Sequence, residues 1–592
     1  LDGSMLFSKV IPLHEVKISG LTVNLVHYGG DSWNFTKLGE RFIVKEKKPN
    51  PDWNIFIKNG FVENARMTIY DIPKNQHSVF ELPSAEVAVN LIKITDNAEF
   101  VIKDAVFTAV PNINNPDKFY FDNINGKAVY SNKEKIDVLD VKRAFFNFRG
   151  ARINALGTMK NLKSPTFTLS GTIKNIDAGE LGRLGAEISA RGSSEKWKGL
   201  KASGKLDVTD STILGQSLEG SIRKIKVENT SVTLTGGKLS APFGKADFDG
   251  TLGLYEITTP GKSNEADIKL SVNSASAARL LEIFDKTQPD GAPEELNKNV
   301  NAMVDSRLKV KAGWKGKEPP ALDVALESFK MSGSETGEIT LSGPIKIRPD
   351  KIEFDLDTSS SKTNFANILT DFPNETDFNS KLHVKGSTVP GKEPPDGLQL
   401  SVKGDVSPSV VKGFKLDRGT VDFSFAPSSL DIRTLTLESG RLSAKASGSI
   451  GTGTERGVKY GVNIGDLGLL SSLVPGDKLA GSMSAEGTVK GTFEKPRLTA
   501  SIKGTDFASR NQKLTVEKIE LAAETYLDPS DLQMKAKGKL KGIEIQGRAM
   551  EAADFDAESR GREVYGGVHI TEAPDRKYEA EFKASGLDTE DK

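Results

Sequence analysis

The chain has 592 residues, of which 37% are hydrophobic and 27% are charged, so it can build cores and is not a disordered chain. Lys and Arg together number 80, as do Asp and Glu, and this zero net charge gives no electrostatic reason to expect nucleic acid as a partner. The chain contains no cysteine, which excludes disulfides, thiolate catalysis and cysteine-based metal sites.

No run of the sequence reaches the roughly 18 apolar residues that a membrane-spanning helix needs. The longest run, Leu467–Val474, is far shorter. The first five residues look like a cloning remnant that ends in a start Met, and the last residues stop without a terminating pattern. We therefore expect the chain to be a piece of a longer protein.

The first predicted element is a hairpin within Ile18–Leu38. Its apolar residues from Ile18 to Leu25 are spaced mostly by two, which is strand spacing, and a Gly-Gly turn follows. The aromatic segment Trp33–Phe35 comes directly after this turn. Such a hairpin is half-buried by pattern, so its apolar face must lie on another part of the protein.

Strict alternation of apolar and polar residues recurs along the rest of the chain, as in Val421–Phe425 and Ile352–Leu356. Short turns rich in Gly, Asn, Asp and Ser separate these runs, and the 56 glycines exceed an average share of about 7%. Strands with one apolar face and short turns predict an antiparallel meander. The predicted fold class is mainly β: a long, curled, repetitive antiparallel sheet with a few short helices.

A longer period is superimposed on the strands. Five times a strand runs into a short helical segment, and these segments are marked by Asp177, Ser274, Asn364, Asp466 and Asp588, at intervals of 97, 90, 102 and 122 residues. Each helical segment that is followed by further chain leads into a turn with aromatic or proline residues and a new alternating strand. The period predicts one supersecondary unit stacked end to end, as in solenoids. The predicted divisions are an N-terminal β region 1–150, repeats 151–265, 266–350, 351–455 and 456–580, and the start of a further repeat at 581–592.

The repeat Leu479–Phe507 resembles the AsmA and TamB superfamily of bacterial envelope proteins. The resemblance is carried by a strand ending in a Gly-x-hydrophobic-x-Gly-Thr pattern followed by proline, here Gly487, Val489, Gly491, Thr492 and Pro496. The N-terminal region is similar to the family through Trp33, Asn34, Phe35 and Leu38, and through Ile55–Asp71, which looks like the hairpin that follows. Two features depart from the family: the third repeat lacks an aromatic at the position of Trp197, and the N-terminal membrane helix is absent.

The resemblance implies a long curled sheet with an apolar trough, anchored in the inner membrane by a helix that this chain lacks and extending across the periplasm. Members of the superfamily are similar to bridge-like lipid transfer proteins. The implied substrate is the acyl chains of phospholipids moving toward the outer membrane, and the implied role is envelope integrity. An outer-membrane assembly component is a further implied partner.

We predict that the trough is lined by the apolar residues of the alternating strands; the alternative is that they fill a closed core. The predicted lipid-groove residues are Ile352, Phe354, Leu356, Val421, Phe423, Phe425, Leu430, Ile432, Val489, Leu498 and Ile502. Trp197, Trp314 and Phe493 occupy equivalent repeat positions, and for them a packing role is favoured over a lipid-lining role.

No motif predicts an enzyme, a cofactor or a metal site. The five histidines are scattered without metal-ligand spacing, and no Walker, G-x-S-x-G or HExxH sequence occurs. The segment Gly451–Gly457 nearly spells a dinucleotide loop, but its last glycine is one residue late. Two non-enzymatic alternatives to lipid transfer stay open, a periplasmic scaffold that assists outer-membrane protein assembly and a solenoid adhesin.

Overall fold

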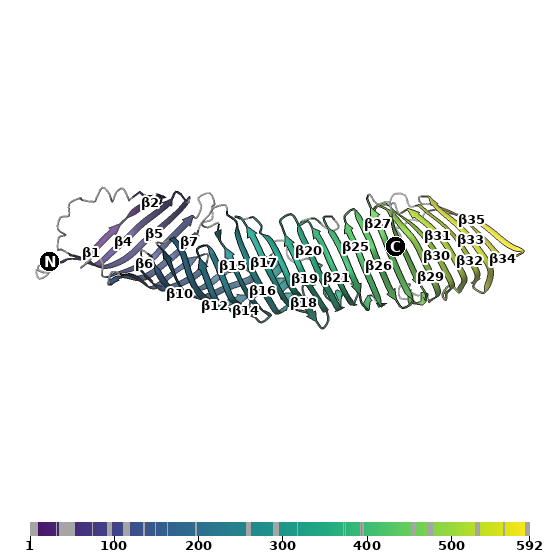
Figure 1. Cartoon of the computed structure of the whole chain (residues 1–592), viewed down its shortest axis with the longest axis horizontal. Coiled ribbons are helices and arrows are strands. Elements are labelled where there is room, and N and C mark those ends of the chain that lie inside the picture. The colour runs from purple at the N-terminus through teal and green to yellow at the C-terminus, as the bar shows by residue number, and fades with distance from the viewer. Residues whose placement is uncertain are drawn as a thin grey trace. The chain divides into compact units, whose positions relative to one another are not determined.

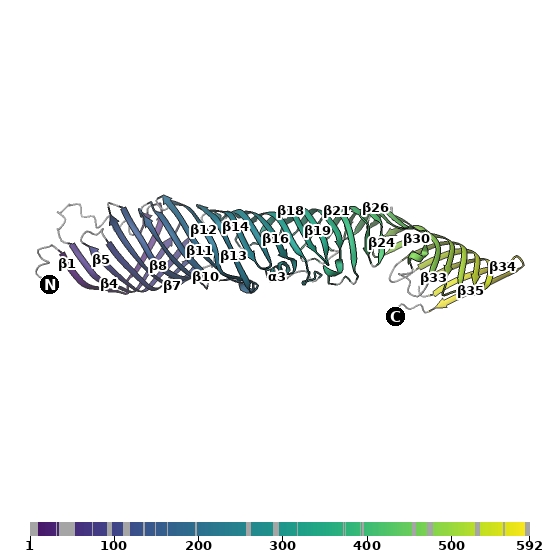
Figure 2. The same cartoon turned by 90° about the horizontal axis from the view of Figure 1, so that it is seen from below.

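The protein is described from a computed structural model (Figures 1 and 2). The structure describes residues 10–30, 32–34, 54–73, 75–91, 97–110, 119–133, 136–148, 150–162, 164–195, 198–255, 262–287, 295–316, 318–370, 372, 374–390, 392, 396–411, 413–452, 457–470, 478–526, 533–560 and 563–585. The chain divides into two compact units. The N-terminal unit comprises residues 1–275, 282–291 and 310–319, and the C-terminal unit comprises residues 276–281, 292–309 and 320–592.

The N-terminal unit is a β-sheet whose strands from β4 onward each pair antiparallel with the next strand in sequence. Among its described residues a short helical turn, η1 (Gly179–Leu181), interrupts the sheet. Its strands are β1 (Val10–Ser19), β2 (Thr22–Gly29), β3 (Ser32–Trp33), β4 (Asn54–Asp71), β5 (Gln76–Leu91), β6 (Asn97–Val110), β7 (Phe119–Lys133), β8 (Ile136–Phe148), β9 (Ala151–Lys160), β10 (Thr166–Asp177), β11 (Gly182–Glu195), β12 (Lys198–Ile213), β13 (Gln216–Glu228), β14 (Ser231–Ala241), β15 (Gly244–Gly253) and β16 (Asn264–Ser276). Helix α3 (Ala277–Thr287) and strand β17 (Met303–Trp314) contribute residues to both units.

The C-terminal unit repeats the same meander, with the short hairpin β23–β24 inserted between β22 and β25. It contains the helical turns η3 (Phe365–Asn367) and η4 (Leu467–Leu470). Its strands are β18 (Ala321–Gly333), β19 (Gly337–Ile347), β20 (Ile352–Thr363), β21 (Thr376–Thr388), β22 (Gln399–Val406), β23 (Ser409–Val411), β24 (Phe414–Leu416), β25 (Arg418–Ala426), β26 (Ser429–Ser439), β27 (Leu442–Gly451), β28 (Gly457–Ile464), β29 (Leu479–Gly491), β30 (Pro496–Ser509), β31 (Leu514–Tyr526), β32 (Gln533–Ile545), β33 (Arg548–Arg560), β34 (Glu563–Ala573) and β35 (Arg576–Ser585). The predicted fold class, a mainly β, curled and repetitive antiparallel sheet, is confirmed.

The N-terminal strands differ from the predicted pattern. The predicted hairpin in Ile55–Asp71 is wrong, because β4 is one continuous strand that passes through Asn59–Gly60 with a bulge rather than a turn. The segment expected as one strand from Ile18 is divided between β1 and β2, and both run parallel to β4. A left-handed Gly20 (φ 74°) provides the break between them.

The predicted Gly-Gly turn follows β2, and Trp33 of the predicted aromatic segment ends β3. His27 pairs with Trp33, and their rings lie 4.7 Å apart. The side chain of Asn34 holds β2, since its Oδ1 accepts from the Val26 amide at 3.0 Å and its Nδ2 donates to the Asn24 carbonyl at 2.7 Å. Phe35 and Leu38 of the same motif lie outside the described residues.

Bulges keep the apolar residues of neighbouring strands on one face. Between β12 and β13 the pairs Gly204–Ile225 and Leu206–Ile222 are two residues apart on one strand and three on the other. The extra residue on β13 lets Ile222 and Ile225 both lie on the apolar face, although they are three residues apart in the sequence. Several other bulges contain a left-handed residue with a short polar side chain, such as Asn175 (φ 58°), which tolerates that backbone conformation better than a β-branched residue does.

Three of the predicted repeat marks open a short helical turn by the same contact. Asp177 accepts the Gly179 amide at 2.9 Å, Asn364 accepts the Ala366 amide at 3.2 Å, and Asp466 accepts the Gly468 amide at 2.9 Å. The second mark, Ser274, lies inside β16, and α3 begins three residues later at Ala277. The fifth mark, Asp588, lies outside the described residues.

The helical segments of the C-terminal unit pack at the ends of strands. A buried cluster joins the first turn of α3 to the stretch 300–304 and to the ends of β18 and η3: Ala277, Val300, Ala302 and Val304, with Leu280, Leu281, Phe329, Met331 and Ile368 packed against it. The Ala277 amide donates to the Ala302 carbonyl at 2.9 Å and the Asn297 amide to the Ile368 carbonyl at 2.8 Å. A second cluster, of Val516, Ile543 and Ala553, lies among β31–β33.

We expect Asn364→Ala to loosen η3 without unfolding the sheet. The substitution removes the acceptor of two amides, those of Ala366 and of Thr376 at 3.1 Å. Loss of such a cap costs about 1 kcal/mol, so protection of these amides against hydrogen exchange falls about fivefold. The control Asn364→Asp keeps the acceptor oxygen and keeps the protection, and equal loss in both variants contradicts the capping role.

Candidate functional site

All eleven predicted groove residues lie on one face of the C-terminal sheet, which we call the apolar face. Cross-strand pairing joins them into rows, each running perpendicular to the strands. One row crosses β18–β27 through Val324, Ile345, Phe354, Gly386, Leu400, Phe425, Leu430 and Ile450. The next row crosses β20–β30 through Leu356, Val384, Val402, Phe423, Ile432, Gly448, Val458, Val489 and Leu498.

Two further rows complete the apolar face and reach β35. Val421 belongs to a row of mostly small residues that continues through Leu435, Ala446, Tyr460, Gly487, Ala500, Ala523, Ala536, Ala557, Gly566 and Phe582. Ile502 belongs to the row Leu437, Ala444, Val462, Ala485, Ile502, Leu521, Gly538, Phe555, Val568 and Ala580. Ile352, at the end of its strand, pairs with Ile347 and Thr388. Every position from Leu356 to Leu498 in the second row is apolar or glycine.

The N-terminal unit carries an equivalent apolar face that sequence reasoning did not single out. Four rows cross all strands from β9 to β16, and each contains only apolar residues and glycine. One of them is Ala155, Gly171, Ile188, Leu206, Ile222, Gly237, Phe248 and Leu270. The signal in the sequence is weak here because glycines and bulges interrupt the alternation.

Large side chains on the apolar face are half-buried. In the part of the chain that the structure describes, the buried hydrophobic residues are mostly Ala and Val, and no aromatic ring is among them. All eleven predicted residues are of intermediate exposure. A Phe or Leu beneath a second layer would be buried almost completely. The rows are therefore not the centre of a conventional closed core.

Aromatic rings on the apolar face lie on glycines of the neighbouring strand. Six directly opposed pairs share this arrangement: Phe167–Gly192, Phe248–Gly237, Phe354–Gly386, Tyr460–Gly487, Phe555–Gly538 and Phe582–Gly566. A Cβ built on each of these glycines would come within 2.2–2.8 Å of the opposite ring. Because glycine has no Cβ, the ring can lie close to the backbone of the neighbouring strand. The ring then covers the hydrogen bonds between the two strands and projects little above the sheet.

Phe493 lies against one end of the apolar face. It is 43% exposed and belongs to the turn between β29 and β30, yet its ring centroid is 6.3 Å from that of Phe425 on β25. Four strand spacings in a flat sheet would separate these positions by about 19 Å. Curvature of the sheet and folding of the turn bring the two rings together. Of the other two repeat aromatics, Trp314 ends β17, and Trp197 lies outside the described residues.

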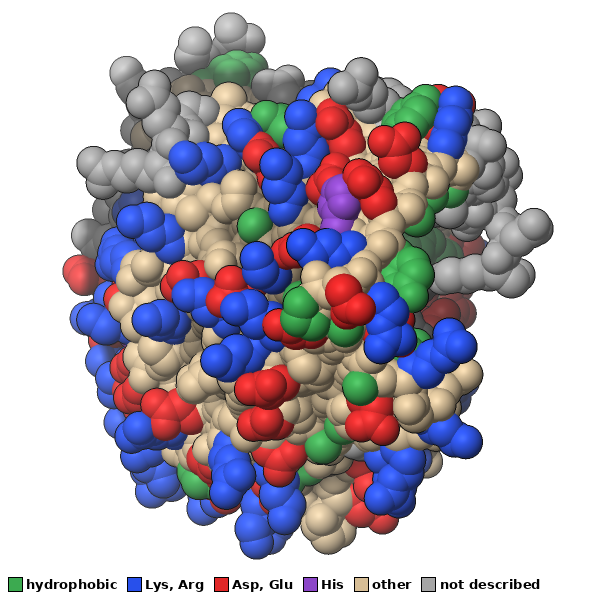
Figure 3. Space-filling model, turned by 90° about the vertical axis from the view of Figure 1, so that its right-hand side faces the viewer, with side chains coloured by type: hydrophobic (Ala, Val, Ile, Leu, Met, Phe, Trp, Pro, Cys, Tyr) green, Lys and Arg blue, Asp and Glu red, His purple; other side chains and the backbone are tan. Residues whose placement is uncertain are grey.

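The opposite face of the sheet, the polar face, carries charged and hydroxyl side chains in cross-strand pairs. Lys535 lies 3.2 Å from Glu558 and Lys539 lies 3.3 Å from Asp554, and both pairs are directly opposed in register. Figure 3 shows the two signs of charge intermixed over the visible surface. Exposed pairs of this kind contribute little each, about 0–1 kcal/mol, but they keep the surface free of like-charge repulsion.

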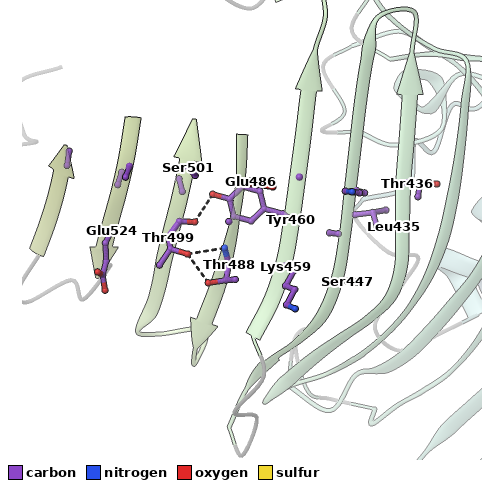
Figure 4. Close-up of a pocket in the computed structure, with 18 of the residues that line it drawn as sticks. Leu435, Thr436, Ser447, Lys459, Tyr460, Glu486, Thr488, Thr499, Ser501 and Glu524 are labelled. Carbon is purple, nitrogen blue, oxygen red and sulfur yellow. Dashed lines mark hydrogen bonds between the residues drawn. The ribbon is translucent and has the colours of Figure 1, made fainter. Parts of the chain in front are cut away.

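A hollow of about 1040 Å³ in the C-terminal unit lies on the polar face (Figure 4). Its lining includes Lys459, Glu486 and Thr488, whereas Val489 and Leu498 of the apolar face do not contribute. Thr488 and Thr499 share a hydroxyl hydrogen bond of 2.8 Å. The hollow therefore lies on the side of the sheet opposite to the eleven predicted groove residues.

Tyr460 links three strands of the same region. Its ring lies on Gly487 of β29, and its hydroxyl donates to the Thr499 carbonyl of β30 at 3.0 Å (Figure 4). Burial raises the pKa of Tyr460, so the phenol stays protonated and keeps this donor role. The Tyr460 hydroxyl is the one polar side-chain group in its row, and the hydrogen bond to Thr499 satisfies it as a donor.

Among the described residues, no group of three or more His, Asp and Glu side chains could hold a metal ion. His383 lies between Asp355 and Asp357, at 3.0 and 2.9 Å, on the exposed polar face. No helix in the described ranges is long and apolar enough to cross a membrane. In comparisons with known proteins, no family model, no curated protein and no solved structure matches the chain.

We expect Gly538→Ala to destabilise the C-terminal unit through its clash with Phe555. The three atoms nearest to a Cβ at Gly538 all belong to that ring, at 2.2–3.0 Å, so the ring has to move off the sheet. Overpacking of this kind costs about 1–3 kcal/mol. The cost is measured as the change in the free energy of unfolding in urea.

The matched control is Gly567→Ala on β34. A Cβ at Gly567 would meet nothing closer than 3.4 Å, and the residue lies on the polar face. This substitution is expected to be neutral within about 0.5 kcal/mol. In a Phe555→Leu background the cost of Gly538→Ala shrinks, and an undiminished cost would show that the ring is not its cause.

Proposed function

We propose that the chain is a lipid-transfer conduit that holds phospholipid acyl chains along its apolar face. The observation that carries the proposal is the set of unbroken apolar rows whose large side chains are only half-buried. A surface of this kind has to be covered by a ligand or a partner, because contiguous exposed apolar area is unfavourable in water.

The chemistry of the rows suits acyl chains. Each methylene that leaves water contributes about 0.8 kcal/mol, so a lipid tail is held firmly without any specific polar contact. Successive strands of a row offer similar apolar contacts at a regular spacing of about 4.8 Å. A tail that slides along the row exchanges equivalent contacts, so no large barrier opposes its movement.

The low-lying aromatic rings support the same proposal. Rings that rest on glycine, such as Phe354 on Gly386, provide apolar area without blocking the space above the sheet. Phe493, beside Phe425 and partly exposed, is placed to contact a tail at one margin of the face. The charged headgroups would stay in water beyond the strand ends.

The setting of this activity is also a proposal. The resemblance to the AsmA and TamB superfamily points to a Gram-negative periplasm, an inner-membrane anchor outside this chain, and transport toward the outer membrane. No catalytic step and no cofactor is needed, since transfer moves lipid between like environments. Assistance to outer-membrane protein assembly and adhesion are the competing functions, and the lipid content of the purified protein separates them from transfer.

We expect the purified chain to carry several phospholipids, and Phe423→Asp or Ile432→Glu to remove most of them. Both residues pair directly with each other in one apolar row, so a carboxylate there meets acyl chains instead of water. Native mass spectrometry with lipid extraction counts the lipids bound. Circular dichroism checks that the sheet is retained.

Ser424→Asp is the matched control for the lipid measurement. Ser424 neighbours Phe423 on β25 but lies on the polar face, 3.4 Å from the Ser401 hydroxyl. The Ser424→Asp substitution adds the same negative charge at the neighbouring position but on the polar face. The number of bound lipids is therefore expected to stay unchanged. A lipid-free wild-type protein, or equal loss in the control, would overturn the conduit and favour the assembly scaffold.

A further inference from the structure

The polar face of the N-terminal unit contains two adjoining hollows over β8–β13, of about 970 and 760 Å³. They share four lining residues: Thr158, Thr168, Arg191 and Ser203. The shared residues are directly opposed across β9–β12, in the order Thr158, Thr168, Arg191, Ser203. The two hollows are therefore halves of one recess, with Arg191 near its middle.

Basic residues dominate the lining of this recess although the chain as a whole carries no net charge. The larger hollow has one acidic residue, Asp140, against Lys142, Arg191, Lys205, Arg223 and Lys224. The smaller hollow has one acidic residue, Glu228, against Lys160, Arg191, Lys201 and Lys226. Both acids are already paired, Asp140 with Lys142 and Glu228 with Lys226 at 2.8 Å.

The side chain of Arg191 has no ion-pair or hydrogen-bond partner among the described residues, and hydroxyl groups surround it. Thr168 and Ser203 are opposite it on the neighbouring strands, and Ser189 and Ser193 are two residues away on its own strand. Here a guanidinium and a ring of hydroxyl donors face the same recess.

A bulge adds charge at one side of the recess. The bulge between β12 and β13 places Arg223 and Lys224 side by side, both exposed and neither paired with an acid in the described part of the chain. The bulge is required to keep Ile222 and Ile225 on the apolar face, as described above. The same irregularity concentrates two positive charges on the opposite face.

We propose that this recess binds phosphate groups of an anionic ligand. Guanidinium and ammonium groups pair with phosphate oxygens, Arg in a two-bonded geometry, and the hydroxyls of Ser and Thr donate further hydrogen bonds. The proposal concerns the face opposite to the acyl-chain surface and does not rest on the lipid-transfer function. The phosphate can belong to a soluble phosphorylated compound or to a lipid headgroup.

The chemistry of the recess argues against nucleic acid as the ligand. Its only lining aromatic, Phe167, belongs to the apolar face, so no ring is available to stack on nucleic-acid bases. A ligand that enters with a phosphate group uses both the Lys side chains and the hydroxyl groups of the recess.

The test is calorimetric titration of the full chain with inorganic tripolyphosphate at low ionic strength. We expect saturable binding that Arg191→Gln weakens about tenfold or more and that Arg223→Gln with Lys224→Gln also weakens. Lys535→Gln is the control, since it removes one positive charge from the polar face of the C-terminal unit. All these residues are exposed, so the variants are expected to fold.

Competition separates the two sources of phosphate. If vesicles containing anionic phospholipid displace tripolyphosphate from the wild type and bind the Arg191→Gln variant weakly, the recess binds lipid headgroups. Vesicles without effect on tripolyphosphate binding assign it to soluble ligands. Absence of tripolyphosphate binding, or an equal loss with Lys535→Gln, would overturn the proposal.

Discussion

The whole structure depends on keeping the two-residue alternation of the strands in phase from one strand to the next. A slip of one residue at any pairing would move an apolar set to the polar face and reverse every strand that follows. The bulges absorb such slips locally, as at Arg223–Lys224, so that Ile222 and Ile225 still fall in apolar rows. The register of each strand pairing therefore determines whether a row continues, and a central core does not.

In the described part of the chain no second layer packs on the sheet, so the sheet has to be stable by other means. Each strand contacts chiefly its neighbours, so stability accumulates along the sheet, as in repeat proteins. The backbone ladders, the rings that rest on glycine and the opposed charges of the polar face all act between adjacent strands. Short helical segments pack against particular strand ends, as α3 does in the cluster around Ala302. Because the stabilising contacts lie between adjacent strands, the large side chains of the apolar face stay partly exposed.

The two faces of the sheet differ in how their contacts are arranged. The apolar face offers rows of similar apolar contacts from strand to strand. The polar face offers charges in defined positions, and around Arg191 these charges are not balanced. A balanced total charge can thus conceal a local surplus, because neutrality of the chain says nothing about which side chains the pairing of strands brings together.

The sequence by itself determined the fold class and the face on which Phe354, Phe423 and Val489 lie, because alternation depends only on the chain's own pleat. It also located the helical turns at Asp177, Asn364 and Asp466, since a carboxylate or amide that accepts a backbone amide acts locally. Tertiary structure alone decided that β4 runs straight through Asn59–Gly60, with β1 and β2 parallel beside it. It also decided which glycine lies under which ring, that Phe493 reaches Phe425, and that Arg191 has hydroxyls around it. These features arise from pairing between distant residues, and the register that creates them is not encoded in any single strand.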